Sequence, residues 1–182
     1  MRTSIFFGTL LNAGALTGLL GGPVWAQEKH ALTITNEGAT GKYVQQLTLE
    51  ADDVPGHQVR AYEIQRTYIA DKGPMVDGER ITETWTRGTS SLTNGVGPAS
   101  GFTTWNTDAG GKIFVESTGV SEGKTTETGS KRGTYHGMGR IVGGTGRFAK
   151  IRGVLVETAT FDNDPKTGYS TLESRGEYWY EK

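Results

Sequence analysis

A glycine-rich segment in the C-terminal third constrains the fold more than any other part of the chain. Gly139–Gly153 holds five glycines in fifteen residues, between two stretches that have the composition of strands. Gly143, Gly144 and Gly146 favour a tight turn, because glycine adopts positive φ without steric cost. The glycine spacing matches neither a phosphate loop nor a dinucleotide-binding fingerprint. The segment therefore predicts a turn between two strands, after which Phe148 anchors the chain.

The N-terminal 26 residues have the features of a secretory signal peptide. Arg2 is the only charged residue among them, and the run Ile5–Leu20 is apolar. Val24-Trp25-Ala26 fits the small-x-small cleavage rule, which makes Gln27 the new N-terminus. No later apolar run is long enough to span a membrane. We therefore expect a periplasmic or secreted protein of a Gram-negative bacterium, with no membrane span after cleavage.

Composition excludes several classes of chemistry. The chain has no cysteine, so thiol nucleophiles, thiolate metal sites and disulfides are ruled out. A formal net charge of −1 predicts no nucleic-acid partner. The segment Asp162–Glu173 faintly resembles a calcium-binding loop, but Lys166 and Thr167 occupy positions where that loop needs a ligand and a glycine. We expect neither a metal nor a cofactor.

Period-two alternation runs through most of the mature chain and predicts an all-β protein. We expect short loops of small residues at 88–100 and 121–132, a hairpin turn at 108–111 and a turn at 162–168. About eight strands at regular spacing fit a sandwich or, in our preferred interpretation, an antiparallel barrel. Residues 1–26 are then the signal peptide, 27–41 an N-terminal arm or first strand, and 42–182 a single barrel domain. The expected strands cover 43–50, 57–70, 80–87, 101–105, 112–116, 133–142, 151–161 and 169–180.

Two stretches carry a resemblance to a known family. They are Gly101-Phe102 through Asp108-Ala109-Gly110-Gly111-Lys112-Ile113-Phe114, and Gly143–Phe148 continuing to Ile151-Arg152-Gly153. In this order and spacing they resemble the allene oxide cyclase-like and dirigent-like barrels, which belong to the calycin-type β-barrels. The resemblance implies an eight-stranded barrel that often forms a trimer and binds an apolar or phenolic small molecule in its interior. It also implies that any enzymatic activity needs no cofactor.

Charged residues at alternate positions give one set of candidate site residues. Glu83 shares a strand face with Trp85 and Arg87, and Glu173 shares one with Arg175, Glu177 and Trp179. If these faces point into the barrel, a buried glutamate with a raised pKa becomes a general acid or base, and an arginine orients an anionic ligand. If they point outward, the same residues form cross-strand ion pairs.

Further candidates are a histidine and the aromatic side chains. His136 and its neighbour Tyr135 lie in a glycine-rich strand and are candidate catalytic residues. Trp85, Trp105, Trp179, Phe102 and Phe114 either line an aromatic pocket or fill the barrel core. In a small barrel these two roles compete for the same space.

These observations leave three hypotheses for function. The first is an exported barrel that binds a small apolar or aromatic molecule in its interior. The second is a cofactor-free isomerase, cyclase or lyase that acts on such a molecule, so whether the protein is an enzyme stays open. The third is an envelope interaction protein. A one-residue error in strand register exchanges the inner and outer faces, so the sequence does not decide between the three hypotheses.

Overall fold

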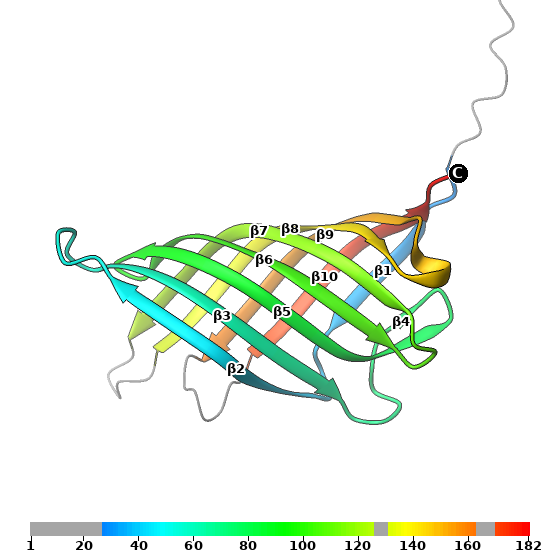
Figure 1. Ribbon diagram of the computed structural model, residues 1–182, viewed down its shortest axis with the longest axis horizontal. Helices are drawn as coiled ribbons and strands as arrows, with labels where there is room; N and C mark the ends of the chain where they lie inside the picture. Colours follow the sequence, from blue (N-terminus) through cyan, green and yellow to red (C-terminus); the bar gives the residue numbers. More distant parts are fainter. Residues whose placement is uncertain (1–26, 126–130, 163–169) are drawn as a thin grey trace, which may run out of the picture.

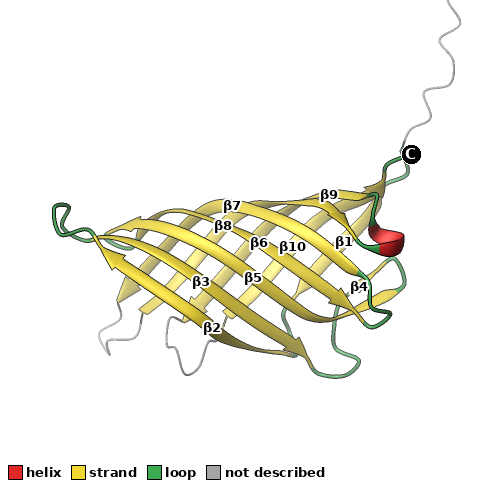
Figure 2. Ribbon diagram, viewed as in Figure 1, coloured by secondary structure: helices red, strands yellow, loops and turns green. Residues whose placement is uncertain are grey.

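The computed structural model describes residues 27–125, 131–162 and 170–182. Within this part the chain forms ten strands and one short 3₁₀ turn (Figure 2). The predicted signal peptide and residues 163–168 of the predicted turn lie outside the described residues. The strands are β1 (His30–Thr35), β2 (Ala39–Glu50), β3 (His57–Tyr68), β4 (Met75–Val76), β5 (Glu79–Thr93), β6 (Val96–Thr107), β7 (Lys112–Thr125), β8 (Lys131–Gly144), β9 (Ile151–Asp162) and β10 (Ser170–Tyr180), and the 3₁₀ turn η1 is Gly146–Phe148.

The strands form one antiparallel sheet in the order β1-β10-β9-β8-β7-β6-β5-β3-β2, with β4 paired to β5. The sheet curls into a barrel (Figure 1). The link between β1 and β2 connects the two ends of the sheet: the Asn36 N–H donates to the Leu172 carbonyl (3.2 Å), and the Ile69 N–H donates to the Gly38 carbonyl (2.9 Å). The predicted all-β antiparallel barrel is confirmed, with ten strands in place of about eight. The segment left open as an arm or first strand contains strand β1.

Two of the predicted loops are wrong where the structure describes them, and residues 126–130 of the second lie outside the described residues. In the first, β5 continues to Thr93 and β6 begins at Val96, so only Asn94 and Gly95 turn, both with positive φ (51° and 85°). In the second, β7 continues to Thr125 and β8 begins at Lys131. Small residues lie in these strands because they face a crowded interior, so their composition resembles that of a loop. The hairpin at 108–111 is confirmed: Gly110 has a φ of 84°.

One half of the interior is packed with apolar side chains, and we call it the packed half. It contains the end of β8, the start of β9 and η1. Phe148 of η1 is fully buried there, next to the turn that Gly146 (φ 58°) makes possible. The predicted glycine turn is therefore confirmed. The packed half consists of Leu32, Ile34, Tyr68, Val76, Ile81, Trp105, Ile113, Val115, Ile141, Phe148, Ile151, Leu155 and Tyr178.

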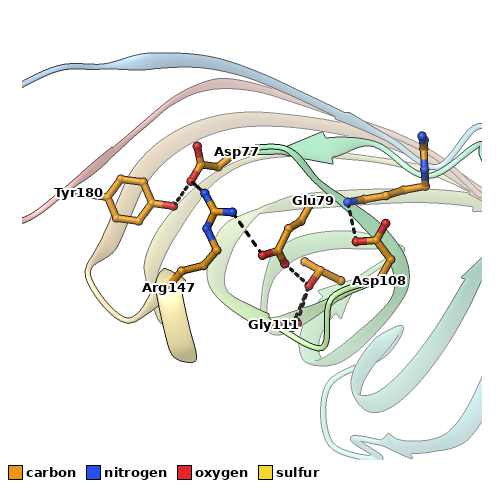
Figure 3. Close-up of polar contacts among 8 residues, drawn as sticks. Asp77, Glu79, Asp108, Gly111, Arg147 and Tyr180 are labelled. Atoms are coloured by element: carbon orange, nitrogen blue, oxygen red, sulfur yellow. Dashed lines mark hydrogen bonds and ion pairs between the residues drawn. The ribbon is translucent and has the colours of Figure 1, made fainter.

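A polar network covers the rim of the packed half (Figure 3). The Arg147 guanidinium contacts the Asp77 carboxylate at 2.5 Å and the Glu79 carboxylate at 3.6 Å. The Tyr180 hydroxyl donates to Asp77 (2.8 Å), and the Thr107 hydroxyl donates to Glu79 (2.5 Å). We call these five residues the Asp77 network. It ties η1, the β4–β5 turn and the last strand together.

Candidate ligand-binding cavity

The other half of the interior contains a cavity of about 150 Å³. Most of the long strands run through both halves of the interior, so they give one end to the packed half and the other end to the cavity. The described residues that line the cavity come from β2, β3 and β5–β10. They are Tyr43, Arg60, Tyr62, Ile64, Arg66, Thr86, Ser90, Ala99, Ser100, Gly101, Thr103, Ser117, Ser121, Tyr135, Glu157, Ala159, Phe161 and Leu172.

The cavity exists because large side chains on β3 face small ones on β5. Arg60 of β3 is opposite Ser90, and Tyr62 is opposite Gly88. A methyl group at Gly88 would lie 2.6 Å from the Tyr62 hydroxyl oxygen, so this position accommodates the ring only as glycine. The same wall continues through small residues of β6 and β7, which do not fill the space.

The glycines of β8 make room for two further polar side chains. A methyl group at Gly137 would lie 2.2 Å from the Tyr135 hydroxyl oxygen. A methyl group at Gly139 would lie 2.8 Å from Oε1 of Glu157, which is on the neighbouring strand β9. The glycines of this strand therefore keep space for a tyrosine and a glutamate inside the barrel.

Three polar atoms at the cavity are buried and have no hydrogen-bond partner. They are Nη2 of Arg60, Oγ of Ser90 and the hydroxyl oxygen of Tyr135. Buried polar atoms in proteins are nearly always hydrogen-bonded, because an unpartnered one costs about 1–3 kcal/mol. Water or a polar ligand inside the cavity would supply the missing partners.

Burial also changes the acidity of the groups that line the cavity. It raises the pKa of Glu157, an effect that hydrogen bonds from Ser117 and Ser174 partly oppose. It raises the pKa of Tyr135 well above its ordinary value, and the neighbouring Glu157 carboxyl adds to this rise. The pKa of Tyr62 is raised by burial and then by Tyr43. Each of these groups thus favours its neutral, proton-donating form more than it would in water.

Of the sequence-predicted site residues, Tyr135 alone lines the cavity among the described residues. Its neighbour His136 lies on the outer face of β8 and is exposed, because successive side chains of a strand point to opposite faces. The predicted pair therefore divides between the interior and the surface.

The predicted face of β5 points away from the cavity. Glu83 accepts hydrogen bonds from Gln65 (2.5 Å) and Asn106 (2.9 Å). Burial raises the pKa of Glu83, but side-chain hydrogen bonds, first that from Gln65, outweigh this and lower the pKa overall. Arg87 on the same face forms an ion pair with Glu63 (2.7 Å), and its guanidinium carbon lies 5.7 Å from the Trp85 ring centre.

The predicted face of β10 also points outward. Glu173 forms an ion pair with Arg175, and Glu177 forms one with Lys29, whose ammonium lies 5.4 Å from the Trp179 ring centre. The inward positions of β10 are those of Leu172, Ser174, Gly176 and Tyr178, which pair with inward residues of β9. Of the two interpretations left open for these charged residues, the outward one describes the structure: Glu63–Arg87 is a cross-strand ion pair, whereas Glu173–Arg175 lies within β10. These residues form no interior pocket.

The remaining aromatic candidates lie outside the cavity as well. Trp105 is buried in the packed half, so it serves the core. Phe102 and Phe114 lie side by side on the outer face, with ring centres 5.9 Å apart. Their outward position follows from the register, since Phe102 is opposite Arg87 and the inward Gly101 is opposite Gly88.

Sequence reasoning missed Arg60, Tyr62 and Glu157, although the sequence contains a signal for each. Arg60 and Tyr62 lie on the same face of their strand as Ile64 and Tyr68. This face has enough apolar character to be buried. Glu157 shares its face with the buried Leu155. In each case, a polar or charged residue on a largely apolar strand face indicates a candidate site residue inside the barrel.

A second, larger hollow lies on the outer face of the barrel wall. It has a volume of about 1220 Å³ and includes Leu47, Phe102 and Met138. Its charged residues neutralise one another, since Arg87 pairs with Glu63 and Arg140 pairs with Glu116 (2.9 Å). It lacks the buried unpartnered groups that mark the interior cavity.

Neither a cluster of metal ligands nor a membrane-spanning helix is found in the described part of the chain. No group of three or more histidine, aspartate or glutamate side chains in that part is arranged to hold a metal ion. No helix in that part is long and apolar enough to cross a membrane.

Comparison with known proteins gives a structural similarity at low sequence identity. No protein-family model matches the chain, and no curated protein matches it significantly. The structure of the pterocarpan synthase dirigent protein GePTS1 aligns with 96% of this chain and 100% of its own, with a TM-score of 0.43 and 16% sequence identity.

Proposed function

We propose that the protein binds one small ring-containing molecule in its interior cavity. The observation that carries this proposal is the set of three buried, unpartnered polar atoms of Arg60, Ser90 and Tyr135 around a cavity of about 150 Å³. An apolar cavity of about this volume holds a benzene-sized ring. The first of the three hypotheses from the sequence is thereby narrowed from an apolar or aromatic ligand to a ring with polar substituents.

Benzyl alcohol is a suitable probe, because it combines one ring with one hydroxyl group. Isothermal titration calorimetry should show binding to the wild-type protein. Ala159→Leu adds side-chain volume inside the cavity and should weaken binding at least about tenfold. Ala61→Leu adds the same volume on the outer face and is the matched control. Equal affinities of these two variants would contradict binding in the cavity.

The buried carboxyl of Glu157 supports a second candidate function, which is catalysis. Its carboxyl is buried inside the barrel, and burial raises its pKa, which suits a general acid. In this case the protein is the cofactor-free isomerase, cyclase or lyase of the second hypothesis. Native mass spectrometry of the protein purified from its own cells would identify a retained compound, and Glu157→Gln should then abolish its turnover while binding persists. Undiminished turnover in the variant would sink the catalytic hypothesis.

The third hypothesis, an envelope interaction protein, would be favoured by a barrel without a cavity, and a cavity is present. Export through cleavage after Ala26 and assembly into a trimer stay predictions. N-terminal sequencing and native mass spectrometry of the mature protein test both.

A further inference from the structure

We propose that the molecule bound in the cavity is a carboxylate, a single-ring organic acid whose anionic group is held by Arg60. This inference rests on the proposed function and names the class of its ligand. It is argued from the burial of Arg60, from the groups around it and from the charges of the cavity lining.

Arg60 is a charged side chain in an unusual environment. Its residue exposure is 8%, and Nη2 of its guanidinium has no hydrogen-bond partner. Burial of a charge is strongly unfavourable unless a partner compensates it. The planar fork of a guanidinium matches the two oxygens of a carboxylate, and this pair is among the strongest charge-assisted contacts in proteins.

Ser90 supplies a second donor at the same place. It is directly opposite Arg60 in the β3–β5 register, and its buried hydroxyl also has no partner. A carboxylate that accepts from Nη2 of Arg60 also has a lone pair available for the serine hydroxyl. One anionic group therefore satisfies two of the three unpartnered atoms.

Among the described residues, the cavity lining does not pair Nη2 of Arg60 with a carboxylate. Glu157 is the sole carboxyl group among the described residues that line the cavity. It comes from β9, and because Nη2 of Arg60 has no hydrogen-bond partner, it does not pair with that atom. Burial raises the pKa of its carboxyl and outweighs the hydrogen bonds from Ser117 and Ser174 (3.4 Å), which lower it, so the neutral carboxyl is favoured. Arg66 also lines the cavity and adds a second guanidinium group.

The rest of the cavity fits a ring. Tyr43, Tyr62 and Phe161 contribute aromatic surface to the lining. The hydroxyl of Tyr135, on a different wall from Arg60, is the third unpartnered atom and suits a polar substituent on the ring. The volume of about 150 Å³ has room for one ring.

Benzoate and benzamide test the charge requirement, because they have nearly the same shape and differ in charge. In calorimetric titrations the wild-type protein should bind benzoate at least about tenfold more tightly than benzamide. Arg60→Gln should remove this preference and leave benzamide affinity unchanged. Arg87→Gln, which removes an arginine from the outer face, is the control and should keep the preference.

The outcomes separate this inference from the proposed function. Equal affinities for benzoate and benzamide in the wild type would overturn the carboxylate inference, while binding in the cavity would stand. Failure of benzoate, benzamide and benzyl alcohol alike would overturn both. If Arg60→Gln does not fold, Ser90→Ala replaces it, with an expected loss of about threefold or more in benzoate affinity and none for benzamide. Unchanged benzoate affinity in Ser90→Ala would then count against the assigned subsite.

Discussion

The two halves of the barrel interior use the same kinds of polar side chain in opposite ways. On the rim of the packed half, Arg147 contacts two carboxylates and Tyr180 donates to Asp77 (Figure 3). At the cavity, Arg60 and Tyr135 each bury a polar atom that has no partner. The types of residue are alike, but the protein itself partners these groups on the rim and leaves Nη2 of Arg60 and the Tyr135 hydroxyl unpartnered at the cavity.

This difference has a thermodynamic consequence. A partnered polar group contributes about 0.5–3 kcal/mol to stability, whereas a buried unpartnered one costs about 1–3 kcal/mol. Binding sites commonly keep such costs, since groups arranged for a ligand are not arranged for stability. Substitutions in the two halves should therefore differ in size and in sign.

The largest effect is expected in the packed half. Phe148→Ala removes a fully buried ring and leaves a cavity, which should lower the free energy of unfolding by about 3–5 kcal/mol. Denaturant titration measures the change. Phe102→Ala, on the outer face, is the matched control and should cost about 1 kcal/mol or less. Similar losses in the two variants would mean that η1 does not anchor the core.

The next largest effect is expected from filling the space beside Tyr62. Gly88→Ala forces the Tyr62 ring to move, which should cost about 1–3 kcal/mol in stability and weaken benzyl alcohol binding. In Gly123→Ala the new methyl group would have its nearest neighbour at 3.7 Å, so binding should persist. Thermal unfolding measures the change in stability, and calorimetry measures the affinity for benzyl alcohol. A Gly88→Ala variant that binds as well as the wild type would show that Tyr62 does not shape the site.

The Asp77 network should give a smaller loss. Asp77 has a φ of 48°, a conformation that asparagine tolerates, so Asp77→Asn changes charge with little backbone strain. The variant weakens the contacts with Arg147 and Tyr180 and should lose about 1–2 kcal/mol. Denaturant titration tests this, with the exposed Asp53→Asn as a control that should change stability by less than about 0.5 kcal/mol. If Asp77→Asn leaves the free energy of unfolding unchanged, the Asp77 network does not contribute to stability.

The smallest effect concerns pH. Because the pKa of Glu157 is raised in the folded protein, the folded state binds its proton more tightly than the unfolded state. This contribution to stability is complete below the unfolded pKa of about 4.3 and is lost as pH rises through the folded value. Glu157→Gln should therefore have a higher Tm than the wild type at pH 7, and the gap should close near pH 4. If the difference in Tm between the variant and the wild type widens as the pH falls, the pKa of Glu157 is not raised in the folded protein.

Much of the fold was predictable because it depends on local patterns. Period-two alternation indicates strands, and the glycines before Phe148 indicate a turn that the structure confirms. The loop predicted at 88–100 and the described ends of the loop predicted at 121–132 are strand, because glycine, serine and threonine are common both in loops and in strands that face a narrow interior.

The site was less predictable, because it depends on which strand face points inward. Glu173 and Arg175 alternate as convincingly as Ser174 and Tyr178, and burial alone separates the two faces. Arginine is usually exposed, so its residue type predicts a position on the surface for Arg60 and not in the interior. The absence of a partner for its guanidinium is a property of the folded interior and has no counterpart in the sequence.

The stability of Arg60→Met tests most directly whether the cavity polar groups serve a ligand and not the fold. Methionine keeps the apolar stem and removes the buried charge, so the variant should be about 1–2 kcal/mol more stable than the wild type in denaturant titrations without ligand. Benzoate should then stabilise the wild type but not the variant. A loss of 1 kcal/mol or more in ligand-free Arg60→Met (about the effect expected for Asp77→Asn) would show that Arg60 supports the fold, and would contradict this account.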